Sequence, residues 1–435
     1  MDHQDQPKFI GKYEIVKKLG QGATSVVWLA YDPFAGRMVA LKVMKPEILK
    51  DPKTGPIHRK QLLNEASLAG KLSHPHIIAI YDAVVEGEDC YVAMEYVSGG
   101  TLERYTEPDS LLPIPRVIEL MFKCCRALNY AQFNGVIHRD IKPANMLLTD
   151  EGEIKISDMG AAIVMSNPDQ TQINDIGSPV FMSPEQIAGE LLTHQTDIYS
   201  LGVVMYSLLT GRLPYTAKNL TGLFYQILNA QYATPRSLRP EIPEELERIV
   251  LHAMRKSKAE RYQDWKEFGN DLAAAGQLPG MTHEEEGMGD TEKFTVLREM
   301  EMFQEFTDTE LWEIIRIGEW TKHPAKTVLL REDEFGDDFY ILVEGTVGVT
   351  KGPRLLNVIQ KGDSFGEMAY ISGKAVPRSA TITANSDVTV MRISPQMLIR
   401  TSDHCQLSFN LAFLRTLADR LRQVDDRFSK IVVAS

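Results

Sequence analysis

The chain has 435 residues, of which 43% are hydrophobic and 24% charged, and its formal net charge is −12. This length is enough for two or three domains, because one hydrophobic core rarely grows past roughly 250–300 residues. The acidic balance argues against general binding to nucleic acid or to an anionic membrane. Residues 1–9 are polar and no uncharged apolar run reaches the length of a membrane span, so we expect a cytoplasmic protein. The four cysteines, Cys90, Cys124, Cys125 and Cys405, form no C-x-x-C pair and are expected to be reduced thiols.

Residues 13–43 alternate with the period of β-strands, and a glycine-rich turn, Gly20-Gln21-Gly22, interrupts them. Glycine allows backbone N–H groups to approach phosphate oxygens where a side chain would clash. A Walker A motif is excluded because no Gly-Lys-Ser/Thr follows the turn. A Rossmann motif is excluded because 26–30 is expected to be a strand rather than a helix.

Further elements follow in chain order. Residues 60–72 and 115–133 have a helical period, and 91–97 form a strand that ends in a Ser-Gly-Gly joint. A short strand is expected from residue 154, directly before Asp158. Residues 198–210 are apolar but too short to span a bilayer, which indicates a buried helix.

Between two apolar segments lies a polar loop, His138-Arg139-Asp140 with Lys142 and Asn145. Asp140 can accept a hydroxyl proton, Lys142 can reach a transferring phosphate, and Asn145 can hold Mg²⁺. This loop resembles the catalytic loop of the protein kinases. The other kinase motifs stand in order around it: the glycine-rich turn, Val39-Ala40-Leu41-Lys42, Asp158-Met159-Gly160 and Ser183-Pro184-Glu185.

The resemblance implies an ATP site in the first part of the chain. Lys42 would bridge the α- and β-phosphates and be held by Glu65, and the backbone at Glu95 and Val97 would bind the base. The ATP-binding residues that it implies are Leu19, Gly20, Gly22, Val27, Ala40, Lys42, Glu65, Glu95 and Val97. Ser25 replaces the third glycine of the kinase turn and Met159 replaces the usual Phe, and neither change removes a catalytic group.

The same resemblance assigns the chemistry. Asp140, Lys142 and Asn145 are the catalytic candidates, and Asn145 and Asp158 are the Mg²⁺ ligands. Ser178 and Lys142 favour serine or threonine over tyrosine as acceptor.

In the activation segment, residues 161–176, Thr171 is the first phosphorylation candidate and Ser166 the second. A phosphate there would dock on Arg139, and an unmodified, solvated loop is the alternative. Glu185 is expected to form a buried ion pair with Arg261, and Asp197 is expected to brace the backbone of the catalytic loop.

Residues 276–291 combine glycine, proline and a carboxylate run without an apolar period, which predicts a linker. Residues 294–320 have a helical period. Short alternating strands then follow, which predicts a small barrel or jelly roll. The expected strands are 327–330, 339–343, 347–351, 357–360 and 379–384.

Ser364-Phe365-Gly366-Glu367 and Pro377-Arg378-Ser379 resemble the phosphate-binding segment of the cyclic-nucleotide-binding domain. The resemblance implies that backbone N–H groups after Gly366 and the guanidinium of Arg378 bind the cyclic phosphate. Glu367 would accept from the ribose 2′-hydroxyl, and Ser379 would add a hydroxyl. Both cAMP and cGMP fit this pattern, and a jelly roll without a ligand is the alternative.

Residues 403–428 predict a closing amphipathic helix. Its apolar residues at near-heptad spacing are Leu407, Leu411, Leu414, Ala418, Leu421 and Phe428. We expect this face to pack on its own barrel, and a nucleotide lid and a homodimer seam are the alternatives.

The predicted fold class is an α+β multidomain protein: a bilobal kinase fold over residues 11–275, a linker over 276–291, and a jelly-roll cyclic-nucleotide-binding domain with flanking helices over 292–430. The expected function is an ATP- and Mg²⁺-dependent serine/threonine kinase that acts on proteins and on itself and is regulated in cis by cAMP or cGMP. One alternative is a non-catalytic nucleotide-sensing scaffold, against which the intact Lys42, Asp140, Asn145 and Asp158 argue. Another is a kinase whose second domain only docks or dimerises, against which Glu367 and Arg378 argue.

Overall fold

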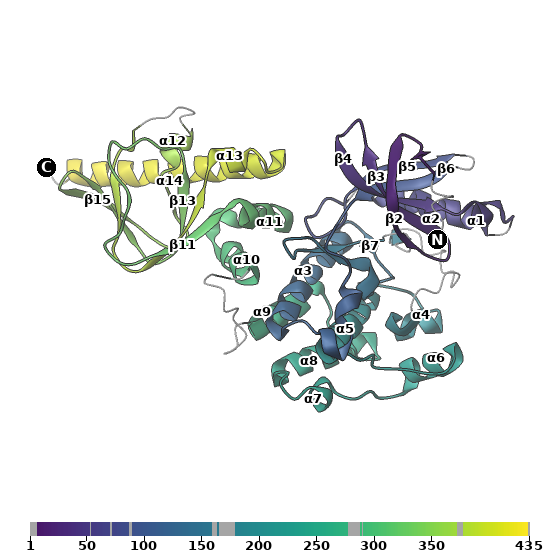
Figure 1. Cartoon of the computed structure of the whole chain (residues 1–435). Coiled ribbons are helices and arrows are strands. Elements are labelled where there is room, and N and C mark those ends of the chain that lie inside the picture. The colour runs from purple at the N-terminus through teal and green to yellow at the C-terminus, as the bar shows by residue number, and fades with distance from the viewer. Residues whose placement is uncertain are drawn as a thin grey trace. The chain divides into compact units, whose positions relative to one another are not determined.

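The computed structural model describes residues 7–52, 54–69, 72–86, 89–158, 163–164, 179–276, 288, 290–371 and 377–433. The chain forms two compact units, residues 1–282 and 283–435 (Figure 1). Both units contain helices and strands, as expected for an α+β multidomain protein. None of the helices in the described ranges is long and apolar enough to cross a membrane.

The first lobe of the first unit is built on a six-stranded antiparallel sheet with the order β1-β2-β3-β4-β6-β5. Its elements are β1 (Phe9–Ile10), β2 (Tyr13–Gln21), β3 (Ser25–Asp32), β4 (Arg37–Met44), α1 (Pro46–Lys50), α2 (Gly55–Ala69), β5 (Ile80–Glu86) and β6 (Asp89–Glu95). Helix α2 covers one face of the sheet, where Leu62 packs with Val92 and Met94 (Figure 1). The register pairs Gly20 with Val27 and Val27 with Lys42, so the glycine-rich turn lies beside the strand that carries the lysine.

The second lobe of this unit is mainly helical. Its elements are η1 (Leu102–Tyr105), η2 (Pro108–Ser110), α3 (Ile114–Phe133), β7 (Val136–Ile137), η3 (Pro143–Asn145), β8 (Met146–Leu148), β9 (Ile154–Ile156), β10 (Ile163–Val164), η5 (Pro179–Phe181), α4 (Pro184–Ala188), α5 (His194–Thr210), α6 (Leu220–Asn229), α7 (Pro235–Leu238), α8 (Glu244–Ala253), η6 (Lys258–Glu260) and α9 (Trp265–Gly276). Helix α5 is its centre, because every residue from Thr196 to Thr210 is buried. This confirms the buried helix expected at 198–210, which is apolar all round because it has no solvent face.

The second unit contains two four-stranded antiparallel sheets, β11-β18-β13-β16 and β12-β17-β14-β15, which confirm the expected small β-rich domain. Its elements are α10 (Asp290–Glu299), η7 (Glu301–Phe303), α11 (Asp308–Ile317), β11 (Glu319–His323), β12 (Val328–Leu330), β13 (Phe339–Glu344), β14 (Val347–Lys351), β15 (Arg354–Ile359), β16 (Ser364–Phe365), α12 (Glu367–Ile371), β17 (Thr381–Ala384), β18 (Val388–Ile393), α13 (Pro395–Leu398) and α14 (Asp403–Val433). Residues from both sheets, among them Leu342, Val347 and Val390, form one buried core.

Two predictions for this unit were incomplete. The helical stretch 294–320 is divided, because Thr307 begins a new helix with a capping box in which Thr307 and Glu310 exchange side-chain-to-backbone hydrogen bonds. Strands β11, β16 and β18 were not predicted. In β18 five of the six residues are buried, so it lacks the alternation of a half-exposed strand.

The last helix packs on the barrel as predicted, but the prediction that it does so through the leucines at heptad spacing was wrong for the three whose side chains the structure describes. Leu407, Leu411 and Leu414 are 55%, 44% and 61% exposed. The buried face of α14 instead carries Phe409 and Phe413, whose rings lie 5.6 and 4.9 Å from the ring of Phe339 on β13. Large aromatic rings bury more apolar area than leucine, so they determine which face turns inward.

Candidate functional site

The first pair of site residues joins the two lobes of the first unit. Lys42 lies on β4, Asp158 follows β9, and Lys42 Nζ is 2.6 Å from Asp158 Oδ1. Burial raises the pKa of Asp158, but the charge and hydrogen bond of Lys42 lower it further, and the net pKa is about 2. Asp158 is therefore ionised at neutral pH. The side chain of Glu65, the expected partner of Lys42, lies outside the described residues.

Asp140, Lys142 and Asn145 meet in the loop before β8. Lys142 Nζ donates to Asp140 Oδ2 at 2.6 Å, and Asn145 Nδ2 donates to the same oxygen at 3.0 Å and to the Asp140 carbonyl at 2.9 Å. Because the Asn145 NH₂ group is turned toward Asp140, its amide oxygen is left as an acceptor for another group. An amide oxygen and the carboxylate of Asp158 are the hard oxygen ligands that Mg²⁺ prefers. These residues therefore fit the ion that the sequence implied.

The backbone of this loop is held from the core. Asp197 on α5 accepts from the backbone N–H groups of His138 and Arg139, both at 2.7 Å. Burial raises the pKa of Asp197. Arg139 has a φ of 69°, a conformation rare for a residue with a side chain, and the two hydrogen bonds to one carboxylate hold it there. The predicted bracing role of Asp197 is confirmed.

Sequence reasoning missed the link between the loop and Asp158. Ser157 N donates to the Asn145 carbonyl at 2.8 Å, and the Ser157 carbonyl lies 2.9 Å from His138 Nε2. These bonds fix the residue before Asp158 against both ends of the catalytic loop. A serine at this position belongs to no motif. Its place directly before Asp158 was therefore the one feature of the sequence that could have indicated a role.

The candidate adenine site is an apolar cluster at the end of β6. Ala40 and Val97 are buried in it, and Val27 and Leu147 are partly buried against it. Leu147 was not predicted, although Met146 and Leu148 on either side are buried, which turns Leu147 to the other face of β8.

The hinge backbone restricts how a base can bind. Glu95 N donates to the Ala79 carbonyl at 2.8 Å, so a base contact at Glu95 has to use its carbonyl oxygen. The Glu95 carboxylate forms an ion pair with Lys155 Nζ on β9, at 2.8 Å, and is held there. Leu19, near the end of β2, is 40% exposed.

Glu185 and Arg261 form the predicted buried pair. Their side chains are 2% and 0% exposed, and two parallel bonds of 2.7 and 2.8 Å join them. Beside this pair, Gln186 on α4 donates to the Arg139 carbonyl at 2.9 Å. The segment after the activation loop is thereby fixed to the catalytic loop. Met159, Ser166, Thr171 and Ser178 lie outside the residues that the structure describes.

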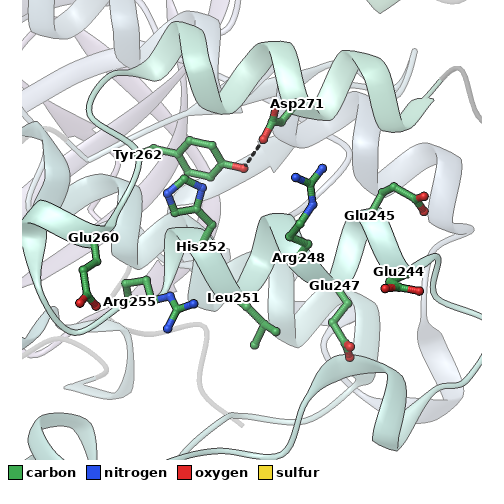
Figure 2. Close-up of a pocket in the computed structure, with 10 residues that line it drawn as sticks. All are labelled: Glu244, Glu245, Glu247, Arg248, Leu251, His252, Arg255, Glu260, Tyr262 and Asp271. Atoms are coloured by element: carbon green, nitrogen blue, oxygen red, sulfur yellow. Dashed lines mark hydrogen bonds between the residues drawn. The ribbon is translucent and has the colours of Figure 1, made fainter.

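A groove of about 740 Å³ on the second lobe is lined by none of these residues. It runs between α8 and α9, where Tyr262 donates to Asp271. Arg248 and His252 on α8 and Arg255 just after that helix also line it (Figure 2). Glu244, Glu245, Glu247 and Glu260 also line it. Its mixed charge does not match a site for a triphosphate.

In the second unit, Arg378 is a buried cation held by carbonyl groups. It is 8% exposed, and its guanidinium donates to the Gly366 carbonyl at 2.9 Å and the Asp338 carbonyl at 2.7 Å. Within the described ranges no carboxylate forms an ion pair with it. A buried charge is costly unless it is compensated. Because this guanidinium has hydrogen bonds but no carboxylate among the described residues, an anion bound to it would complete the compensation.

Two glycines lie close to the guanidinium of Arg378. Gly366 has a φ of 78°, and a Cβ there would lie 3.1 Å from the guanidinium. A Cβ on Gly336 would lie equally close, at 3.1 Å. Glu367 follows as the first residue of α12 and is 1% exposed, whereas Ser379 is exposed. Gly366, Glu367 and Arg378 therefore lie together, as the resemblance implied.

Comparison with known proteins identifies a family for each of the two units. The family model of the protein kinase domain matches residues 13–268, and that of the cyclic nucleotide-binding domain matches 320–404. The first match covers more than half of the chain, and the chain belongs to the protein kinase family. The prediction of a kinase domain followed by a cyclic-nucleotide-binding domain is confirmed.

Several bacterial kinases are similar to the kinase part of the chain. The serine/threonine-protein kinase PrkC of Bacillus subtilis is 34% identical over 266 residues, which are 61% of this chain and 40% of that protein. The serine/threonine-protein kinase PknB of Mycobacterium tuberculosis is 35% identical over 268 residues, which are 60% of this chain and 42% of that protein. A probable serine/threonine-protein kinase of Streptomyces coelicolor is 35% identical over 291 residues, which are 64% and 42%. The chain thus spans about two fifths of the length of these curated relatives.

Proposed function

We propose that the first unit transfers the γ-phosphoryl group of ATP to serine or threonine hydroxyls of proteins, including its own chain. The observation that carries this proposal is the convergence of Asp140, Lys142 and Asn145 in one loop, beside the ionised Asp158 that Lys42 holds. A non-catalytic scaffold has no need for this complete set of groups.

The roles follow from the geometry. Asp140 is positioned to orient the acceptor hydroxyl and to take its proton as the oxygen attacks the γ-phosphorus. The bond from the γ-phosphorus to the bridging oxygen breaks, and ADP leaves. Lys142, 2.6 Å from Asp140, stabilises negative charge on the transferred group. When bound to Asn145 and Asp158, Mg²⁺ supplies further positive charge to the phosphates.

A transfer assay tests this proposal. Wild-type protein is incubated with Mg²⁺ and ATP labelled at the γ-phosphate, alone and with a generic basic protein, and phosphoserine and phosphothreonine are separated after hydrolysis. Asp140→Asn should reduce the rate by roughly 10²–10⁴-fold, the usual contribution of a positioned base. Asp150→Asn is the matched control, because Asp150 lies exposed in the turn between β8 and β9. Equal rates in wild type and Asp140→Asn would refute the proposal.

We also propose autophosphorylation of the activation segment. Thr171 is the first candidate and Ser166 the second, and Arg139 directly before Asp140 supports the proposal as a docking site for the phosphate. Mass spectrometry after incubation with ATP should find phosphate at Thr171, and none in the Asp140→Asn protein. Phosphate at neither residue in the wild type would contradict it.

For the second unit we propose binding of cAMP or cGMP and control of the kinase by that ligand. The buried guanidinium of Arg378 supports this, because among the described residues it is compensated by two carbonyl groups and by no carboxylate. The ligand can act only if it binds the active and inactive arrangements with different affinity, typically by about 1–3 kcal/mol.

Calorimetric titration with each nucleotide tests the binding. Arg378→Gln should weaken binding by at least about tenfold, since a hydrogen bond to a charged group is worth roughly 1.5–3 kcal/mol. Arg354→Gln, on the exposed strand β15, removes the same charge as a control. No binding of either nucleotide to the wild type would leave docking or dimerisation as the role of this unit.

A homodimer is proposed on a separate observation. Leu407, Leu411, Leu414 and Ala418 are exposed on α14 at the 4-3-4 spacing of a coiled-coil seam. Light scattering should show a dimer that Leu411→Glu dissociates, and a monomeric wild type would contradict it.

A further inference from the structure

Lys45 holds the tip of the glycine-rich turn from outside the set of groups assigned to catalysis. Its Nζ donates to the carbonyl of Gly22 at 2.7 Å and to the carbonyl of Ala23 at 2.9 Å. Its backbone N–H donates to the carbonyl of Thr24 at 2.9 Å. Three consecutive carbonyl groups of the turn are therefore bound by one residue.

The side of the sheet on which Lys45 lies follows from strand geometry. Side chains alternate between the two faces of extended backbone. Lys45 keeps an extended conformation, with φ −69° and ψ 135°, and it lies three residues after Lys42. Lys42 points to Asp158 on the side of the candidate active site. The odd spacing places Lys45 on the opposite, outer face.

The hydrogen bonds of Lys45 also determine how the N–H groups of the turn are oriented. In a trans peptide the C=O and N–H bonds point in opposite directions, and the described chain contains no cis peptide bond. The carbonyls of Gly22 and Ala23 share their peptide planes with the N–H groups of Ala23 and Thr24. When Lys45 binds these carbonyls on the outer face, the two N–H groups turn toward the face of Lys42 and Asp158.

Packing alone does not fix the turn. A Cβ placed on Gly22 would meet only the Ser25 carbonyl, at 4.0 Å, and one on Gly20 would meet nothing within 4 Å. Glycine in such open space has access to several peptide orientations. Fixed donors aimed at an anion bind it more strongly than donors that have to be ordered first.

We propose that Lys45 is a positioning residue, which directs the N–H groups of Ala23 and Thr24 at the phosphates of ATP. This inference rests on the proposed kinase function for its ligand. Lys45 touches neither the reacting atoms nor the candidate metal ligands. It acts through the peptide planes of the turn.

Nucleotide binding to the full chain tests the proposal, with ATP–Mg²⁺ and adenosine as probes. Lys45→Met keeps the apolar stem and removes the donors. It should weaken ATP binding about tenfold, a change of about 1.4 kcal/mol, and leave adenosine binding unchanged because adenosine has no phosphates. Lys45→Arg keeps the charge and the donors and should restore most of the affinity for ATP.

Two further measurements separate positioning from charge. Lys17→Met removes an equal charge from an exposed position on β2 and should leave ATP affinity within about twofold of wild type. Amide hydrogen exchange in a peptide covering residues 20–27, without nucleotide, should become faster in Lys45→Met and not in Lys17→Met.

The proposal is overturned if Lys45→Met binds ATP as the wild type does, if it weakens ATP and adenosine equally, or if exchange in the turn is unchanged. It is also overturned if wild-type protein binds no ATP. A wild type that binds ATP but transfers no phosphate would refute the proposed kinase function and leave the binding result for Lys45 valid.

Discussion

Arg261→Met should strongly destabilise the kinase unit. Arg261 is fully buried and donates to both carboxylate oxygens of Glu185 and to the carbonyls of Arg255, Gln195 and Lys256. Methionine fills part of the same volume but leaves the Glu185 carboxylate buried without its cation, although Thr196 Oγ1 still donates to it at 3.0 Å. Removing one partner of a buried pair costs about 3–5 kcal/mol. For a unit of this size, such a loss of unfolding free energy lowers the melting temperature by roughly 6–20 °C.

Differential scanning calorimetry of the full chain measures this effect, because the two compact units can melt in separate transitions. The control is Arg236→Met, which removes an exposed pair with Glu244 at 3.7 Å and should change stability by less than about 1 kcal/mol. The variant Arg261→Met/Glu185→Leu removes both charges and should recover much of the loss. A loss below about 1 kcal/mol for Arg261→Met would refute the reasoning.

The pH dependence of this effect has a definite sign. Burial raises the pKa of Glu185, but the hydrogen bond and charge of Arg261 outweigh it, so the pKa in the folded protein lies below its usual value of 4.5. The wild-type pair therefore contributes stability above that pH and loses it as the pH falls. In Arg261→Met, burial should outweigh the remaining hydrogen bonds to the Glu185 carboxylate, so its pKa should be raised. The difference in unfolding free energy between the two proteins should narrow as the pH is lowered and Glu185 protonates.

Three other results are expected. Asp197→Asn leaves one acceptor oxygen for the two backbone N–H groups that Asp197 now binds. In steady-state assays it should lower kcat roughly 100-fold with little change in the KM for ATP. An unchanged kcat would contradict the bracing role. Burial lowers the pKa of His74 to about 3, so the unfolded chain binds an extra proton between that pH and about 6.5, and stability falls as the pH falls. His74→Phe should flatten the dependence by up to about 1.4 kcal/mol per pH unit in urea titrations, and an unaltered slope would contradict the assignment. Phe413→Ala should destabilise the second unit by about 3–5 kcal/mol in chemical unfolding, and Ile399→Ala, at a 72% exposed position before α14, by less than about 0.5; similar losses would contradict the buried face of α14.

Local spacing made much of the active site predictable. The catalytic groups of the loop lie within six residues of one another, so their meeting needs no knowledge of the rest of the chain. The Glu185–Arg261 pair and the role of Asp197 join segments far apart in the chain, and they were predicted through the family resemblance alone. The structure confirms both.

Other features depend on tertiary contacts that a linear pattern does not encode. Ser157 and Leu147 carry no motif, and only the packing of β8 and β9 beside the loop gives them a role. The heptad leucines of α14 have the stronger sequence pattern, yet the aromatic face packs inward because β13 presents Phe339 to it. Lys45 resembles any exposed lysine until the fold of the turn brings two carbonyl groups to it.

One set of initial rates tests whether the chain is a kinase under nucleotide control: transfer of labelled phosphate from ATP–Mg²⁺, with no addition, with cAMP and with cGMP, in wild type and Asp140→Asn. We expect transfer to serine or threonine in the wild type, a rate changed several-fold by one of the two nucleotides, and loss of transfer in Asp140→Asn under every condition. Transfer that persists in Asp140→Asn, or no transfer by the wild type under any condition, would contradict it.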